Sequence, residues 1–259
     1  MAMRHDHDWI LDIGNTRTKL ASFVSGELAE VWTDDAAEII ANEAMETQQL
    51  PARMLIAASG NASEFWTNWN NRWQRSHPQP QNLVNLHAKM ELGFDVRYDS
   101  LETVGLDRLA NAAAVLAIDP DSQWMVIDMG TCMTVDAVEE HSFIGGAISP
   151  GIDLRFRSMY AGTRALPYPE NWRELASEGV AMHIGNDTLS SLLAGAIGGI
   201  NAEIQGRVDA FRKHWPNFRV ALTGGDASFL EVEDPRLIFV DPNLTWKGYH
   251  QILQNVEQR

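Results

Sequence analysis

Cysteine is almost absent from this chain of 259 residues, which contains only Cys132. A single cysteine cannot form a disulfide within the chain, and it excludes the zinc sites that several cysteines build together. Long hydrophobic runs are missing too, since no stretch reaches the roughly 18 consecutive apolar residues of a membrane-spanning helix. The first residues are polar and lack the layout of a secretory signal. We therefore expect a protein of the reducing cytoplasm that has no membrane partner.

Positive charge is also scarce, because 20 Lys and Arg stand against 35 Asp and Glu, a net charge of −15 at pH 7. Nucleic acids and anionic membranes are bound through clustered Lys and Arg, so neither partner is expected. Small anions stay compatible with this charge, because backbone N–H groups, a metal ion or one or two cations can bind them locally. Hydrophobic residues make up 45% of the chain, enough for a folded core in one large domain or two small ones.

A polar turn that contains glycine follows an apolar strand near the N-terminus. Trp9–Ile13 reads as the strand, Gly14–Thr16 as the turn, and Thr16–Val24 as a second strand. A tight turn of this kind presents successive backbone N–H groups to the oxygens of a phosphate. Lys19 adds a positive charge, and Asp12, at the end of the strand, can hold Mg²⁺ directly or through water. An ordinary hairpin with a polar turn is the alternative interpretation.

The same pattern returns in the second half of the chain. A strand at Trp124–Met129 carries Asp128 near its end, and aligning Asp128 with Asp12 gives an offset of 128 − 12 = 116. At this offset Gly130 matches Gly14, and Thr134 matches Thr18. The repeat predicts two related α/β lobes, an N-terminal lobe at 1–118 and a C-terminal lobe at 119–259.

Alternating strands and helices between the two turns support an α/β protein. The apolar spacing predicts further strands at 53–58, 143–149 and 219–223, and helices at 36–47, 62–74, 105–118, 152–161, 186–214 and 242–256. Gly224-Gly225 follows a buried strand, where glycine lets the backbone approach a nucleoside. Two phosphate turns and this loop, in this order, are typical of duplicated actin-like ATPase (ribonuclease H-like) lobes with an interdomain cleft.

Two charged residues, Asp107 and Arg108, lie in the first turn of the otherwise apolar helix at 105–118. An acidic residue at this place can simply be a solvated residue that the helix dipole stabilises. The functional interpretation is a general base, with Arg108 near a carboxylate or phosphate of the substrate. Phosphoryl transfer to an alcohol needs such a carboxylate to orient the hydroxyl and accept its proton.

These motifs resemble the type III pantothenate kinases, a family of the acetate-and-sugar-kinase/chaperone/actin superfamily. Five pieces in chain order carry the resemblance over almost the whole chain: D-x-G-N-T-x-x-K at Asp12–Lys19, G-x-D-R at Gly105–Arg108, D-x-G-T at Asp128–Thr131, G-G-x-I-x-P-G at Gly145–Gly151 and G-x-x-T at Gly185–Thr188. The second and fourth pieces distinguish this family from its relatives. The resemblance implies an enzyme that phosphorylates pantothenate with ATP, the first step of coenzyme A biosynthesis.

The resemblance also implies a role for each matching residue. ATP would be bound by Asp12, Ile13, Gly14, Asn15, Thr16, Arg17, Thr18, Lys19 and Thr131. Asp107 would be the catalytic base, and pantothenate would be contacted by Tyr98, Gly105, Leu106, Asp107, Arg108 and Thr188. Asp128 would bind the monovalent cation, K⁺ or NH₄⁺, that this family uses beside Mg²⁺. Thr188 would act across the interface of a homodimer.

Two other functions stay open at this point. One is a kinase of another small alcohol on the same fold, although the cysteine-rich zinc motif of one group of sugar kinases is excluded here. The other is a non-catalytic regulatory protein of the same family, against which the intact Asp12, Asp107 and Asp128 argue. Cys132 stands where the family usually has a small residue, and we expect it to be buried. The tryptophans at 66, 69 and 73 match no role in the family, and we interpret them as a packed face of a helix.

Overall fold

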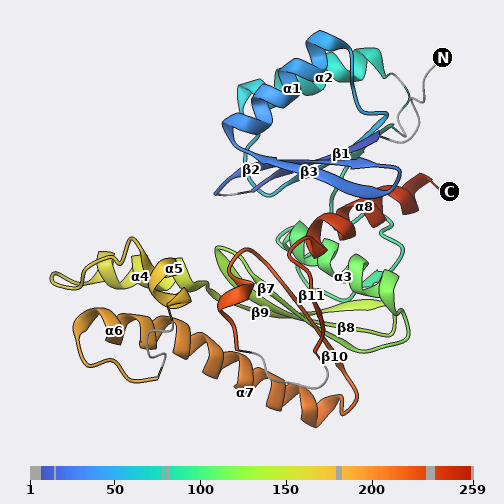
Figure 1. The fold of residues 1–259 in the computed structure, drawn as a ribbon. Coiled ribbons are helices and arrows are strands. Elements are labelled where there is room, and N and C mark those ends of the chain that lie inside the picture. Colours follow the sequence, from blue (N-terminus) through green and yellow to red (C-terminus); the bar gives the residue numbers. More distant parts are fainter. Residues whose placement is uncertain are drawn as a thin grey trace. The chain divides into compact units, whose positions relative to one another are not determined.

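The structure, a computed structural model, describes residues 7–14, 16–77, 79, 82–178, 183–231 and 237–257. The chain forms two compact units, of which the first combines Met1–Pro120 with His141–Phe143 and Leu244–Arg259. The second unit consists of Asp121–Glu140 and Ile144–Asn243. The last helix therefore belongs to the first compact unit (Figure 1). The lobes predicted at 1–118 and 119–259 would place this helix in the second lobe.

A five-stranded sheet with the order β3-β2-β1-β4-β5 forms the base of the first unit. Its strands are β1 (His7–Ile13), β2 (Thr18–Val24), β3 (Glu27–Thr33), β4 (Arg53–Ala58) and β5 (Leu83–Asn85). Strands β1, β2 and β3 are paired antiparallel in sequence order, and β4 and β5 continue the sheet in parallel with β1. This is the hairpin that the sequence predicts at Trp9–Val24, extended by the edge strand β3.

Helices α1 (Asp35–Thr47) and α2 (Glu64–Ser76) cover one face of this sheet (Figure 1). The three tryptophans of α2 are at most 2% exposed and pack on the strand residues Trp9, Leu11 and Ile13. Their spacing of three and four residues places them on one side of the helix. The predicted packed face of tryptophans is confirmed, and the Trp69 indole N–H also donates to the Ala41 carbonyl at 2.7 Å.

The opposite face of the first sheet carries α3 (Leu106–Ile118) and α8 (Leu244–Glu257). The two helices approach so closely that a Cβ atom on Gly248 would overlap the carbonyl oxygen of Ala110. The Thr245 hydroxyl donates to Asn111 Oδ1 at 2.9 Å, which ties α8 to α3 a second time. A short strand, β6 (Asp95–Val96), pairs in parallel with Ser142 and Phe143.

The second unit is built on the strand order β11-β10-β7-β8-β9, with β6 attached beyond β9. These strands are β7 (Trp124–Met129), β8 (Cys132–Glu139), β9 (Ser142–Pro150), β10 (Arg219–Thr223) and β11 (Leu237–Val240). As in the first unit, the leading strand forms an antiparallel hairpin on one side and a parallel pair on the other. The duplicated architecture that the sequence predicts is therefore present in the strand order.

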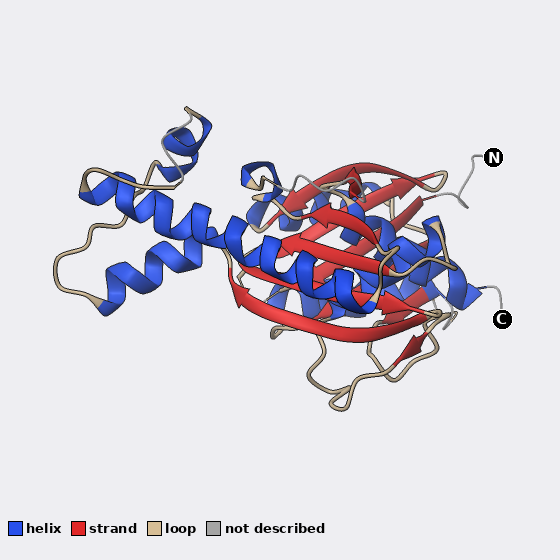
Figure 2. Cartoon of the chain, turned by 90° about the horizontal axis from the view of Figure 1, so that it is seen from below, coloured by secondary structure: helices blue, strands red, loops and turns tan. Residues whose placement is uncertain are grey.

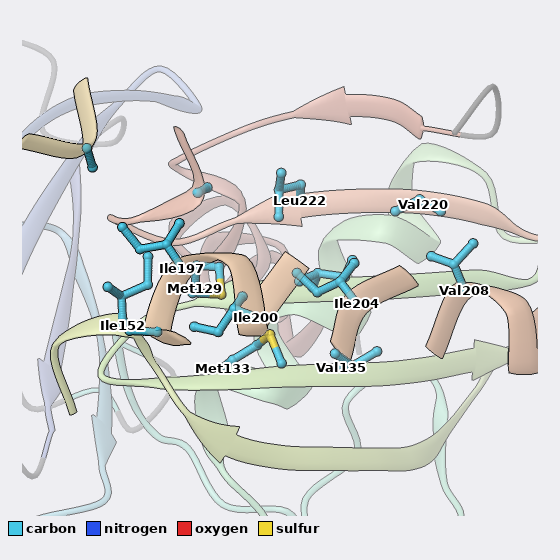
Figure 3. Packing of buried hydrophobic residues seen from close by; sticks show 14 of the residues in the cluster. Met129, Met133, Val135, Ile152, Ile197, Ile200, Ile204, Val208, Val220 and Leu222 are labelled. Carbon is cyan, nitrogen blue, oxygen red and sulfur yellow. The ribbon is translucent and has the colours of Figure 1, made fainter. Parts of the chain in front are cut away.

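One face of the second sheet packs against a long helical segment. This segment consists of α6 (Thr188–Leu193), the π-helical turn η2 (Ala194–Gly198) and α7 (Gly199–His214). Ile197, Ile200 and Ile204 belong to one core cluster with the strand residues Met129, Met133 and Val135 (Figure 3). The predicted helix at 186–214 is confirmed, and the Asp187 side chain caps its start by accepting the Ser190 N–H at 2.8 Å.

Shorter helices complete the second unit. They are α4 (Ile152–Gly162), α5 (Trp172–Ser177) and the 3₁₀ turn η3 (Ala227–Phe229). Figure 2 shows helices that extend beyond one end of the strands, and in Figure 1 α4, α5 and α6 occupy this place. Within the described part of the chain, none of the helices has both the length and the apolar character needed to cross a membrane.

Candidate active site

The turn after β1 is closed by bonds within the first unit. The Gly14 N–H donates to the Arg17 carbonyl at 3.0 Å, and the Thr18 N–H donates to the Asp34 carboxylate at 3.0 Å. Asp12 is half-buried and lies directly opposite Lys19 in the hairpin. Among the predicted ATP ligands, Asn15 lies outside the described residues, and Ile13 is a core residue at 4% exposure. Thr16 and Arg17 present exposed side chains at the tip.

A second loop supports this turn, and sequence reasoning missed it. The N–H groups of Ser59 and Gly60, just after β4, both donate to the Ile13 carbonyl, at 2.9 and 3.0 Å. Because β4 is parallel to β1, its following loop comes to the same edge of the sheet as the turn. A Ser-Gly pair after an apolar strand was the available signal in the sequence.

Asp107 and Arg108 lie in the first turn of α3, but the first is exposed and the second is buried. Asp107 is exposed, and its carboxylate accepts the Arg108 N–H at 2.8 Å. Arg108 is only 3% exposed, and its guanidinium carbon lies 5.6 Å from the ring centre of Tyr98 and 5.3 Å from that of Phe143. These distances are in the range of cation–π contacts. The two ring centres are 6.0 Å apart, so both rings lie on the same side of the Arg108 guanidinium, beside an accessible carboxylate.

The structure brings several predicted pantothenate residues together in the first unit, and it adds one. Tyr98 and Arg108 are in contact, and Gly105 and Asp107 occupy the start of the same helix. Leu106 is 8% exposed and contributes mainly to packing. Phe143 was not predicted, because it comes from β9, far along the chain from Arg108.

The turn after β7 differs from its counterpart by one residue. Met129 pairs with Met133 across this turn, whereas Ile13 pairs with Thr18 across the first. The residue opposite Asp128 is therefore Thr134, which takes the place that Lys19 has opposite Asp12. The alignment of Thr134 with Thr18 at the constant offset of 116 is thus wrong in the structure, because one residue fewer closes the second turn.

Asp128 lies between two threonines on the neighbouring strands. Thr134 of β8 and Thr223 of β10 are its direct cross-strand partners. Both threonines are buried, and neither hydroxyl has a hydrogen-bond partner. An oxygen ligand set of this kind fits a cation at Asp128. Among the described residues, no group of three or more His, Cys, Asp or Glu forms a site for a metal ion.

Two further residues of the second turn are accessible. Thr131 is exposed at its tip, and Cys132 is exposed as well. The expectation of a buried cysteine is wrong, because Cys132 is the first residue of β8 and lies next to the turn. The Gly151 N–H donates to the Thr131 carbonyl at 3.1 Å, so the last residue of the G-G-x-I-x-P-G motif is bonded to the backbone of the turn.

The loop after β10 is pressed against the end of β7. Gly224 has φ +97°, and a Cβ atom there would overlap the backbone of Met129, so glycine is required. The Asp226 N–H donates to the Met129 carbonyl at 3.1 Å. Arg173 of α5 donates to the Asp226 carboxylate at 2.9 Å. Burial raises the pKa of Asp226, and the contact with Arg173 opposes this rise without cancelling it.

Thr188 is exposed at the start of α6, next to the capping residue Asp187. The candidate residues thus fall into two groups. Tyr98, Gly105, Asp107 and Arg108 belong to the first unit with the first turn, and Asp128, Thr131 and Thr188 belong to the second.

Two sheets of the same order, each with a glycine turn after its leading strand, define the actin-like ATPase fold. Solved structures of this fold include a Baf family protein from Campylobacter jejuni, with a TM-score of 0.59 and 19% identity. The match covers 97% of this chain and 100% of that one. A ROK family protein from Streptococcus pneumoniae matches with a TM-score of 0.50 and 13% identity, over 98% of this chain and 100% of that one.

Sequence comparison narrows the class to one family. The family model for type III pantothenate kinase matches residues 9–210, so the chain belongs to the type III pantothenate kinases. The type III pantothenate kinase of Phocaeicola vulgatus is 30% identical over 245 residues, which is 94% of this chain and 96% of that protein. The enzyme of that name from Bacteroides fragilis is 31% identical over 251 residues, again 94% of this chain and 96% of that protein.

Proposed function

We propose that this chain transfers the terminal phosphate of ATP to the hydroxyl of pantothenate, forming 4′-phosphopantothenate, with Asp107 as the catalytic base. Membership of the family supports pantothenate as the substrate and places the reaction at the first step of coenzyme A biosynthesis. The observation that carries the base assignment is the exposed Asp107 carboxylate beside the buried Arg108. A single cysteine supports a cytoplasmic location.

Asp107 and Arg108 would act on different groups of pantothenate. The carboxylate of Asp107 would orient the terminal hydroxyl and accept its proton as the bond to phosphorus forms. Arg108 would attract the pantothenate carboxylate, and its two aromatic neighbours would restrict the position of the guanidinium.

The phosphates of ATP would lie at the two glycine turns. Lys19 and the exposed tip of the first turn supply donors, and Thr131 supplies a hydroxyl from the second. Mg²⁺ would be held by Asp12, whose half-buried carboxylate is an oxygen ligand of the kind this ion prefers. The metal supplies charge neutralisation on the phosphates when bound. A monovalent cation, K⁺ or NH₄⁺, would bind at Asp128.

A homodimer that includes Thr188 is also part of the proposal. Thr188 opens α6, in the helical region at the end of the second sheet. Large apolar side chains are exposed in and near this region, at Tyr160, Ile184 and Leu189. Such side chains on a soluble chain are typical of a surface that another subunit covers.

The test of this function is the Asp107→Asn variant in an ATP-dependent pantothenate phosphorylation assay. Loss of the base should lower kcat by about 10²- to 10⁴-fold, while ATP binding and thermal unfolding stay as in the unchanged protein. Asp35→Asn is the matched control, because Asp35 is also an exposed carboxylate in the first turn of a helix of the first unit. Full activity of Asp107→Asn would contradict its role. Transfer to another small alcohol but not to pantothenate would contradict the substrate.

A further inference from the structure

Asp34 joins β3 to α1 directly beside the first glycine turn. The pairing of β2 with β3 reaches Lys19 opposite Thr33, so Asp34 occupies the next position, which faces Thr18. The Asp34 N–H donates to the Thr18 carbonyl at 2.7 Å, as in a regular antiparallel ladder. The second bond of such a pair would join the Thr18 N–H to the Asp34 carbonyl. Here the Asp34 carboxylate accepts this N–H instead, at 3.0 Å.

The backbone of Asp34 explains this exchange. Asp34 has φ 51° and ψ −123°, and its carbonyl accepts the Glu38 N–H at 3.2 Å as α1 begins. A positive φ is unfavourable for a residue that carries a Cβ atom. Asp34 thus begins the helix with its carbonyl and continues the sheet with its carboxylate, and its backbone is strained as a result.

The second unit builds the same junction without a side chain. Gly151 joins β9 to α4, its N–H donates to the Thr131 carbonyl at 3.1 Å, and its carbonyl accepts the Arg155 N–H at 3.0 Å. Its φ of −68° is one that any residue can adopt. A Cβ atom there would overlap the carbonyl oxygens of Gly130 and Thr131, so a side chain is excluded. The fold therefore requires neither a carboxylate nor a strained backbone at this junction.

The residue that Asp34 holds lies between the two cations of the first turn. Thr18 is flanked by Arg17 and Lys19, so fixing both backbone groups of Thr18 restricts the direction of these two side chains. The second carboxylate oxygen lies 3.9 Å from Arg17 Nε, and both side chains are largely exposed. An exposed ion pair at this distance contributes little to stability. The hydrogen bond to Thr18 is therefore the stronger of the two contacts.

We propose that Asp34 is a positioning residue for ATP, whose carboxylate holds Thr18, and with it Arg17 and Lys19, in the arrangement that receives the phosphates. This inference rests on the proposed function, which places the phosphates at the first turn. A turn that is fixed before ATP arrives loses less conformational entropy on binding. Strain that the fold does not require, beside a binding turn, supports such preorganisation. Asp34 acts through Thr18 and not by touching the nucleotide.

The experiment compares Asp34→Gly with Asp35→Gly, the same change at the next residue, which is also an exposed carboxylate. Isothermal titration calorimetry measures the binding of ATP with Mg²⁺, and thermal unfolding measures stability. Asp34→Gly should weaken ATP binding about tenfold, as for the loss of one hydrogen bond to a charged group. Its melting temperature should change little, because glycine relieves the strain at positive φ. Asp35→Gly should show the reverse, a lower melting temperature with unchanged ATP binding, because glycine weakens the helix.

Asp34→Asn separates the hydrogen bond from the charge. Its amide oxygen still accepts the Thr18 N–H, so ATP binding should return to within about threefold of the unchanged protein. In the phosphorylation assay, Asp34→Gly should raise the KM for ATP and leave the KM for pantothenate unchanged.

The possible failures are distinguishable. Equal ATP affinity of Asp34→Gly and the unchanged protein would refute the positioning role and leave the proposed function standing. If Asp34→Asn binds ATP as weakly as Asp34→Gly, the route through the Thr18 hydrogen bond is refuted. A chain that binds ATP but does not phosphorylate pantothenate would contradict the proposed function, while the calorimetric comparison would still decide the role of Asp34. A chain that binds no ATP would contradict both.

Discussion

Arg108 is the side chain that would bind the carboxylate of pantothenate in the proposed function. A guanidinium at 3% exposure has lost most of its water, and the faces of Tyr98 and Phe143 replace part of that solvation. The rings also restrict the rotamers of a long side chain, so little entropy is lost when a carboxylate binds. In the proposed function, Phe143 would therefore act as a positioning residue for Arg108.

Phe143→Leu tests this positioning role. The variant keeps an apolar side chain of similar size but removes the ring, so we expect the KM for pantothenate to rise about three- to tenfold. The kcat and the KM for ATP should change little, because Asp107 and the turns keep their places. Phe23→Leu is the control, since it removes another buried ring from the first unit, one that stacks on His250 instead. Equal KM values for pantothenate in both variants would argue against the role of Phe143.

Sequence reasoning reached Asp107 and Arg108 because both sit inside one short motif on one predicted helix. It did not reach Phe143 or the Ser59-Gly60 loop, since their contacts join segments that are distant along the chain. The cross-strand partner of Asp128 could not be predicted from the sequence either. A constant offset aligned the two halves correctly at the aspartates, but the shorter second turn shifted every residue beyond it by one register position.

At the scale of elements, α8 is anchored to the first sheet by a buried charged cluster. Asp8 of β1 accepts a hydrogen bond from Arg53 Nε at 2.8 Å, and His250 Nε2 of α8 lies 2.8 Å from its other oxygen. Phe23 stacks on the His250 ring at 4.2 Å. Burial alone would raise the pKa of Asp8, but the contacts with His250 and Arg53 outweigh burial and lower it.

A lowered pKa makes the contribution of Asp8 to stability depend on pH. The contribution is complete above the unfolded-state pKa near 3.8 and is lost as the pH falls through the lower, folded-state value. We expect Asp8→Asn to reduce the free energy of unfolding at pH 7 by about 3 kcal/mol, because Arg53 is left without the carboxylate that balances its charge. Below pH 4 the difference from the unchanged protein should shrink, as urea unfolding across pH would show.

The control for Asp8 is an ion pair on the surface of the same unit. Glu102→Gln removes the partner of Lys89, whose pair is exposed, and should change the free energy of unfolding far less than Asp8→Asn does. An equal loss in both variants would show that burial does not set the strength of the Asp8 cluster.

Most elements follow from local patterns, and the exceptions have physical reasons. The apolar strands and the amphipathic helices were predicted because their residues bury one face. The edge strand β3 was missed because most of its residues are exposed, so no apolar alternation marks it. The pairing of α8 with α3 depends on a close approach at Gly248, which no spacing along the chain reveals.

At the scale of the whole molecule, duplication gives two sheets of related order that differ in the residue opposite the aspartate of the leading strand. The first turn keeps its own lysine opposite the aspartate, and the second presents threonines there. The net charge of −15 offers no long-range attraction for the anions ATP and pantothenate. In the proposed function, local donors and the proposed cations would therefore have to provide the positive charge.

The proposed homodimer makes a prediction at this scale. Sedimentation equilibrium should give twice the 28.9 kDa of the chain, and Leu189→Glu should shift the mass toward that of one chain. Leu189 lies next to Thr188 and is 36% exposed. Ile39→Glu is the control, because Ile39 is an exposed isoleucine of α1 in the first unit and should leave the mass unchanged. A mass of one chain for the unchanged protein would contradict the dimer.

The membership of α8 in the first unit has a consequence for synthesis on the ribosome. All strands of the second sheet have been translated before Leu244 is added, so that unit can close while the chain is still growing. The first unit, although begun earlier, cannot cover α3 until Leu244–Arg259 has emerged. The apolar side of α3 around Ala110 thus stays open through the translation of the entire second unit, and it is the surface that a chaperone on the nascent chain would meet.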